Sequence, residues 1–165
     1  MKRNKIITFV INDIDFFISH RINLIDVCLK LNLKINIITP NFKKDYESLK
    51  NVKVLRYYLN PRGKNIFFEL FSFISLFFKL ILNKSDIYHF ISLKPIVYGG
   101  IYLLLTKTKA IFSFSGLGFF KNIDKKKFYS KILIKVIYLI INSNFEKRMI
   151  FQNSRDFKII KTLIK

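Results

Sequence analysis

Residues 5–11, K-I-I-T-F-V-I, form an almost unbroken apolar run of the length of a β-strand. Such runs are typical of parallel strands that helices cover on both faces, whereas a strand with one wet face alternates apolar and polar residues. Residues 19–31 follow with apolar side chains at the spacing of an amphipathic helix, and Ser19 stands where the N-cap of that helix is expected. The start of the chain therefore predicts a covered strand followed by a helix.

The same alternation continues to the end of the chain. Short runs rich in Ile, Val and Phe predict five more strands, at residues 34–39, 52–57, 86–91, 109–114 and 147–151. Longer patterns predict helices at residues 66–82, from Pro95 to about residue 105, at 125–142, and from a cap at Ser154 onward. Strands that alternate with helices predict the α/β class: a Rossmann-like, doubly wound parallel sheet of about six strands with helices on both faces. No repeat or linker interrupts the pattern, so residues 1–165 are predicted to form a single domain.

The composition excludes several classes of protein. Half of the 165 residues (51%) are hydrophobic and 19 are Phe, which a disordered basic tail would lack. Cys28 is the only cysteine, so no disulfide forms within the chain, and its place in a predicted helix indicates a buried filler. One Cys and two His are too few for a Cys/His metal site, so no metal is expected.

The net charge of +20 comes from 30 Lys and Arg against 10 Asp and Glu. Lys supplies most of it, whereas Arg is the residue usually used to read bases and clamp phosphates. No nucleic-acid-binding motif is present, so no nucleic-acid partner is expected. Lys, Asn, Ile and Phe share A/T-rich codons, so part of the excess indicates compositional drift. The remainder favours an anionic membrane surface.

One segment supports the membrane interpretation. Ile66–Leu82 is strongly apolar, but Glu69 and Lys79 interrupt it, and a spanning helix needs about 20 mostly apolar residues. The pattern leaves spanning open and favours a buried or interfacial helix. The amino terminus does not resemble a signal peptide, because Asp13 soon interrupts its apolar run. We therefore expect a cytoplasmic protein, peripheral on the inner face of the cell membrane.

Candidate site residues follow the predicted strands, because ligands of doubly wound sheets bind at the carboxyl ends of the strands. The first loop, N-D-I-D-F-F-I-S-H-R at residues 12–21, lacks the glycines of a dinucleotide site. It offers Asp13 as a base or hydroxyl acceptor. His20 and Arg21 are predicted in the first turn of a helix, where free amides favour anions. The alternative is that Ser19, His20 and Arg21 form only a cap and a solvated turn.

The loop after the fourth strand reads H-F-I-S-L-K-P-I-V-Y-G-G at residues 89–100. Lys94, at a helix start, is placed where its charge and the helix dipole could hold a phosphate. His89 falls within the strand and is expected to be a packed core imidazole. Gly99 and Gly100 are expected to allow close helix packing.

The loop after the fifth strand begins Ser115, Gly116, Leu117, Gly118. Two glycines directly after a strand let backbone amides approach a ligand closely. A plain strand-to-helix turn would have the same sequence, and only its place at the carboxyl edge favours a site.

Four stretches resemble bacterial family-4 glycosyltransferases, in the order found in that family: residues 9–24 (FVINDIDFFISHRINL), 86–100, 114–119 (FSGLGF) and 148–153 (RMIFQN). The similarity is closest to the polysaccharide and lipid-linked oligosaccharide branch. It implies a GT-B architecture, in which two Rossmann-like domains enclose a cleft and no metal is needed. In that family the carboxy-terminal domain holds the nucleotide-sugar and an E-x7-E motif, which this chain lacks. The resemblance thus implies the amino-terminal, acceptor-side domain alone.

The resemblance also implies a function and partners. It implies transfer of a sugar from a nucleotide-sugar, the co-substrate of the complete enzyme, to a lipid-linked or polysaccharide acceptor, with no cofactor. The chain would be a truncated or split enzyme, inactive without a separate donor-binding domain or subunit. By position, Asp13, His20 and Arg21 would face the acceptor or the transferring sugar, with Asp13 and His20 catalytic, and the loop of residues 115–118 would line the cleft opposite the donor diphosphate. The substrate-binding residues would be Asn12, Ser19, Arg21, Lys94, Ser115, Gly116 and Gly118. The alternative is a non-catalytic, basic, peripheral membrane-binding module that uses Ile66–Leu82 and the lysines of residues 121–135.

Overall fold

A computed structural model describes residues 4–42, 49, 51–60, 65–115 and 128–163. Six strands form one parallel sheet in the order β3-β2-β1-β4-β5-β6. The order reverses between β1 and β4, which are neighbours in the sheet but far apart in the sequence. This confirms the predicted doubly wound α/β fold. The strands are β1 (Ile6–Val10), β2 (Lys34–Thr39), β3 (Val52–Arg56), β4 (Ile87–Ile91), β5 (Lys109–Phe114) and β6 (Lys147–Phe151).

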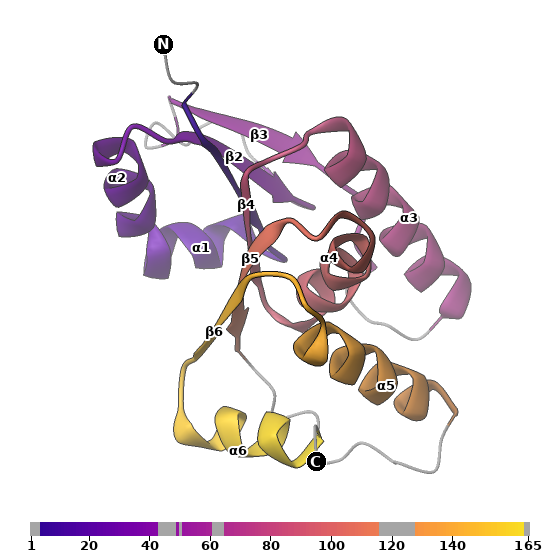
Figure 1. Ribbon diagram of the computed structural model, residues 1–165. Coiled ribbons are helices and arrows are strands. Elements are labelled where there is room, and N and C mark those ends of the chain that lie inside the picture. Colours follow the sequence, from indigo (N-terminus) through magenta and orange to yellow (C-terminus); the bar gives the residue numbers. More distant parts are fainter. Residues whose placement is uncertain (1–3, 43–48, 50, 61–64, 116–127, 164–165) are drawn as a thin grey trace.

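Helices cover both faces of the sheet, each with its own buried apolar cluster. Figure 1 shows α1 and α2 on one side and the row α3, α4, α5 on the other, with α6 beyond the end of β6. The helices are α1 (Ile14–Arg21), α2 (Asn23–Lys30), α3 (Ile66–Leu82), α4 (Leu93–Thr106), α5 (Phe128–Asn142) and α6 (Ser154–Leu163).

The first helix differs from its prediction. Instead of one helix over residues 19–31, α1 begins directly after β1 and α2 follows a bend at Ile22. Asp13, not Ser19, is the N-cap: its Oδ1 accepts hydrogen bonds from the amides of Asp15 (2.9 Å) and Phe16 (3.2 Å). Ser19 instead lies near the end of α1, where its hydroxyl donates to the Asp15 carbonyl. Asp13 precedes Ser19 along the chain and starts the helix before Ser19 can cap it.

The last helix also has a different cap. α6 begins at Ser154, but Asn153 supplies the capping contact, because its Oδ1 accepts from the Asp156 amide at 2.8 Å. Cys28 is buried in α2, as predicted for a filler, and burial raises the pKa of its thiol.

The two glycines of α4 confirm the prediction of close packing. A Cβ atom on Gly99 would lie 1.9 Å from Cε1 of Phe90, and one on Gly100 would lie 2.3 Å from Cδ1 of Ile140. Side chains at these positions would push α4 away from β4 and from α5. The glycines therefore allow α4 to pack closely on β4 and on α5.

Candidate functional site

A cavity of about 670 Å³ lies where the carboxyl ends of β1, β4 and β5 meet, at the point where strand order reverses. Doubly wound sheets bind their ligands at this place. Polar and apolar side chains line the cavity: Ile11, Asn12, Asp13, Phe16, Phe17, Leu59, Ile91, Ser92, Leu93, Lys94, Ser115 and Gln152. Of the predicted site residues, the fold brings Asn12, Asp13, Lys94 and Ser115 together here.

Asn12 and Asp13 provide acceptors at the end of β1. The Asn12 side-chain oxygen is buried and has no hydrogen-bond partner within the described part of the chain. A buried acceptor without a partner carries a desolvation cost that a ligand hydroxyl would remove. Asp13 is exposed, and its Oδ1 takes both capping bonds. The first loop thus contributes two acceptors: the unpartnered side-chain oxygen of Asn12 and the carboxylate of Asp13.

Ser19, His20 and Arg21 do not belong to this group. They occupy the last turn of α1, so the predicted place in a first turn beside free amides is wrong. None of the three lines the cavity as the described residues form it. His20 stacks on Phe16, with ring centroids 4.4 Å apart, and Phe16 does line the cavity. His20 therefore contacts a residue that lines the cavity but does not line the cavity itself.

His89 is a packed imidazole within β4, as predicted. Its Nε2 lies 2.8 Å from Oγ of Ser113 on the neighbouring strand, and its ring packs against Phe9. Burial, with a smaller contribution from the positive charge of Arg21, lowers the pKa of His89 to about 4. The imidazole is therefore neutral at physiological pH and contributes to the core rather than to the site.

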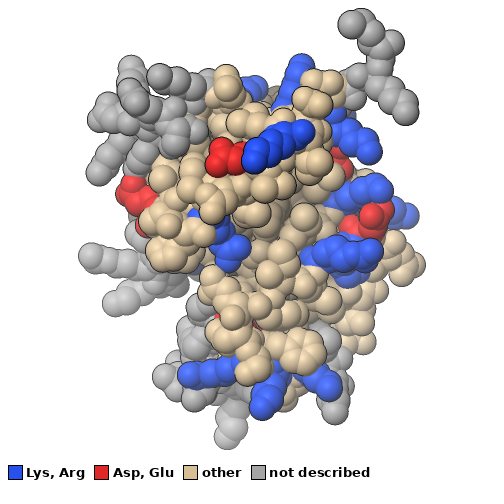
Figure 2. Space-filling model, turned by 90° about the vertical axis from the view of Figure 1, so that its left-hand side faces the viewer, with Lys and Arg blue, Asp and Glu red and all other residues tan. Residues whose placement is uncertain are grey.

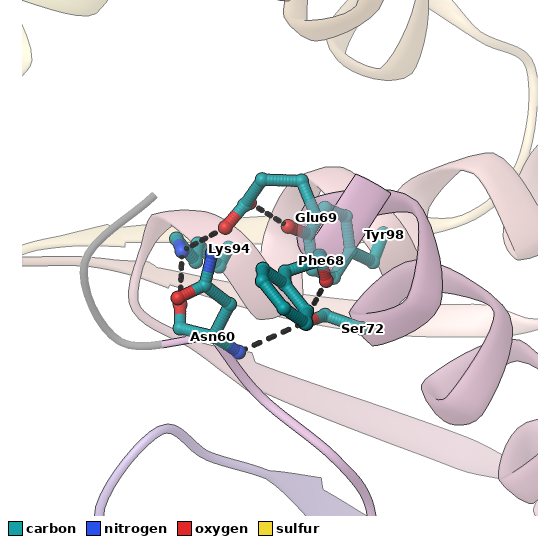
Figure 3. A network of polar contacts seen from close by, with 6 residues as sticks. All are labelled: Asn60, Phe68, Glu69, Ser72, Lys94 and Tyr98. Atoms are coloured by element: carbon teal, nitrogen blue, oxygen red, sulfur yellow. Dashed lines mark hydrogen bonds and ion pairs between the residues drawn. The ribbon is translucent and has the colours of Figure 1, made fainter. Parts of the chain in front are cut away.

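Lys94 lines the cavity but its charge is already paired (Figure 3). Its Nζ lies 2.8 Å from Oε1 of Glu69 in α3 and donates to the Asn60 carbonyl at 2.6 Å. The Tyr98 hydroxyl donates to the other oxygen of Glu69, and burial followed by this bond raises the pKa of Tyr98. The lysine is therefore a weaker anion site than its position in the sequence indicates.

Ser92 was missed by the sequence interpretation. It precedes α4 with φ 80° and ψ 162°, a region that essentially only glycine occupies without strain, and its side chain caps no amide. Its hydroxyl lies 3.3 Å from that of Ser115 across the end of the sheet. Gly116 and Gly118 lie outside the described residues. Nothing in the one-letter sequence signals a strained serine, because φ is set by the meeting of β4 and α4.

Two further lining residues, Phe16 and Gln152, were also not predicted. Phe16 occurs in a run of apolar residues that the helix pattern explains equally well, and Gln152 follows β6, the last strand along the chain. Among the described residues no three His, Cys, Asp or Glu side chains converge as a metal ion would require.

Comparison with known proteins shows the fold. No family model and no curated protein matches the chain. Two structures of sucrose-phosphate synthase from Thermosynechococcus elongatus are similar. One has a TM-score of 0.54 at 8% identity, over 96% of this chain and 95% of that one. The other has a TM-score of 0.58 at 10% identity, over 88% of this chain and 47% of that one.

The glycosyltransferase of kitacinnamycin is similar as well, with a TM-score of 0.55 at 8% identity. The match covers 83% of this chain and 40% of that one, so the chain spans less than half of two of these three structures. At these identities the likeness shows the fold alone. The chain has the Rossmann-like fold found in GT-B glycosyltransferases.

Proposed function

We propose that this chain is the acceptor-side domain of a family-4-type glycosyltransferase, which transfers a sugar from a nucleotide-sugar to a lipid-linked or polysaccharide acceptor. The observation that carries the proposal is the cavity at the strand-order reversal of a sheet with the GT-B type of fold. Sugar acceptors offer hydroxyl groups and an apolar ring face. The cavity offers complements to both in the orphan Asn12 oxygen and the Phe16 ring.

In this proposal Asp13 is the general base. Its Oδ1 is held by the α1 amides, so the orientation of the carboxylate is fixed before a ligand arrives, and Oδ2 is left to accept a proton from the attacking hydroxyl. His20 would position Phe16 through their stacked rings rather than accept a proton itself. Ser115 and Ser92 would donate to or accept from the sugar hydroxyls.

The donor side is also part of the proposal. Transfer requires stabilisation of the departing nucleotide diphosphate and exclusion of water between two domains. The chain spans 40% and 47% of two similar structures, which supports a need for a second, donor-binding domain or subunit. A nucleotide-sugar would then be the co-substrate, and no metal would be used.

A second candidate function is a non-catalytic, basic module that binds the inner face of the membrane from the cytoplasm. The observation that favours it is the strongly exposed apolar side of α3. Figure 2, which views the molecule from the side of α1 and α2, away from α3, shows more blue basic than red acidic side chains on that side. Of residues 121–135, the structure describes Lys131 and Lys135 as exposed. The two functions are compatible, because the acceptor of the first would be embedded in the same membrane.

The test of the acceptor site is a titration of the labelled chain with a neutral oligosaccharide, followed by NMR. We expect the Asn12 side-chain amide and the Phe16 ring to shift. Asn12→Ala should abolish the shift of the Phe16 ring, and Phe16→Ala should abolish the shift of the Asn12 amide. Phe157→Ala, which removes an exposed ring from α6, is the matched control and should leave them intact. Shifts confined to residues away from the cavity would contradict the proposal. Transfer from a nucleotide-sugar by this chain alone would contradict the need for a second domain.

A further inference from the structure

Leu76 and Leu80 of α3 are buried in the core and Phe77 packs against it, but the helix also carries a row of apolar side chains that face outward. Their exposed fractions run from 39% to 77%, and they recur at the three- and four-residue spacing that places them on one side of a helix. This outer stripe consists of Phe67, Leu70, Phe71, Ile74, Phe78, Ile81 and Leu82. Isolated exposed apolar residues are common on proteins, but a continuous apolar side of a helix indicates an interaction surface.

Three polar side chains of the same helix, Glu69, Ser72 and Ser75, face inward. Glu69 reaches Lys94 and Tyr98 in α4. Oγ of Ser72 accepts from the Asn60 amide at 2.8 Å, and Oγ of Ser75 accepts from the Tyr58 amide at 2.8 Å. A helix that packs on a protein and faces water carries polar side chains on its outer side. Since Leu76 and Leu80 also pack into the core, α3 is apolar on both sides, and its outer side is suited to an apolar surrounding.

We propose that the outer stripe of α3 lies flat against a bilayer that contains anionic lipids. Among the described helices none is long and apolar enough to cross a membrane, and α3, with 17 residues, is about 25 Å long. Basic residues lie at its carboxyl end: Lys79 is in the last turn, Lys84 follows, and Nζ of Lys53 donates to the C-cap Asn83 at 2.9 Å. These positions suit lipid phosphates at the edge of an inserted apolar helix.

A bilayer fits this surface better than a second copy of the chain does. Two copies that meet at α3 would bring together chains of net charge +20, which repel each other. An anionic leaflet attracts the same charge. Charge complementarity therefore favours an anionic bilayer over a second copy of the chain as the partner of the stripe.

If α3 lies on the bilayer, the cavity lies close to the membrane surface. The consequence drawn from this for the acceptor rests on the proposed function. The first turn of α3 carries Glu69, whose partner Lys94 lines the cavity, so the cavity wall is one side chain away from the inserted helix. An acceptor whose lipid chain stays in the bilayer could therefore present its polar head to the cavity without leaving the membrane. The surface selects amphiphilic acceptors over free polysaccharide.

The chain contains no Trp, so one introduced Trp reports on one position. We would place it in the stripe at Phe71 or Phe78, and as a matched control at Phe157 on α6, which is similarly exposed. The probes are vesicles of phosphatidylcholine with phosphatidylglycerol, and of phosphatidylcholine alone, carrying bromine on their acyl chains. With anionic vesicles we expect a blue shift and quenching for Phe71→Trp and Phe78→Trp and neither for Phe157→Trp.

A second pair of variants measures affinity. Phe71→Glu should weaken binding to the anionic vesicles at least about tenfold, and Phe157→Glu should not. Thermal melts of both variants in buffer establish that the fold is kept. Flotation of the chain with the same vesicles in a density gradient measures membrane binding independently. If the chain floats with anionic vesicles but Trp at the stripe positions is not quenched, the chain binds membranes through another surface, and the proposal for α3 is overturned. If it does not float, membrane binding and the proposal for α3 are both overturned, while the oligosaccharide titration still decides the acceptor site.

Discussion

Lys94 and Glu69 form an ion pair, Nζ to Oε1 2.8 Å, that joins the first turn of α4 to the first turn of α3 at one wall of the cavity. Both side chains are about one-quarter exposed. The pair cancels the charge of the lysine that would otherwise attract phosphates into the cavity. It also ties the exposed helix α3 to the wall that a ligand would touch.

Replacement of Glu69 by Gln should separate these two roles. We expect Glu69→Gln to lower the free energy of unfolding by about 1 kcal/mol, because Lys94 loses a partly buried partner. Inorganic pyrophosphate should then bind more tightly, since the cavity gains an uncancelled positive charge. Urea melts and a pyrophosphate titration measure the two effects. Glu146→Gln is the control, because its pair with Lys109 is 60% exposed and should contribute nothing measurable.

The buried imidazole of His89 should make stability depend on pH. Its pKa is about 4 in the folded chain and near 6.5 when unfolded, so the unfolded chain takes up the proton first as the pH falls. The contribution is complete above about pH 6.5 and is lost between there and pH 4, by about 3 kcal/mol in total. Urea melts across this range should show a steeper loss for the natural chain than for His89→Phe. Equal slopes for the natural chain and His89→Phe would refute the assignment.

Glycine at position 92 should stabilise the fold. Ser92 is strained at φ 80° and ψ 162°, and a glycine adopts this conformation without the Cβ clash. After allowance for the greater freedom of glycine in the unfolded chain, we expect Ser92→Gly to gain about 1 kcal/mol. Lys107→Gly, at φ 54° and ψ 23° in the milder left-handed region, should gain less. A destabilised Ser92→Gly would mean that the hydroxyl contact with Ser115 outweighs the strain.

Alanine at the two glycines of α4 should destabilise the chain to different degrees. At Gly99 the new methyl group would meet the ring of Phe90, which is fully buried and has no room to move, so we expect a loss of about 2–3 kcal/mol. At Gly100 it would meet the flexible end of Ile140, so the loss should be smaller. Thermal melts rank the two variants. A larger loss at Gly100 would contradict the packing described for α4.

The fold was predictable because each strand corresponds to a short apolar run in the sequence. Runs such as K-A-I-F-S-F predict strands that are covered on both faces, and the structure places a β-strand over the same residues, Lys109–Phe114. The start of α1 was not predictable in the same way. Asp13 and Ser19 are both residues that favour the N-cap position. Which of them caps the helix depends on where β1 ends.

The candidate site was predictable only as a set of loops. The carboxyl-edge rule located Asn12, Asp13, Lys94 and Ser115, all of which line one cavity. It could not identify Glu69 as the partner of Lys94, because the two residues come from helices whose packing no local pattern records. The strain at Ser92 is equally invisible, since it arises from the junction of an entire strand with an entire helix.

The exposed outer stripe of α3 gives the net charge of the chain a role in keeping copies of the protein apart. A protein that displays nine large apolar side chains along one helix would be expected to associate with its own copies in water. A charge of +20 opposes each such encounter over roughly the Debye length, about 10 Å at moderate ionic strength. Concentrated salt removes this protection while it strengthens apolar association. We therefore expect ionic strength to control the solubility of the free chain, because the repulsion between its lysines keeps the apolar stripes of different copies apart.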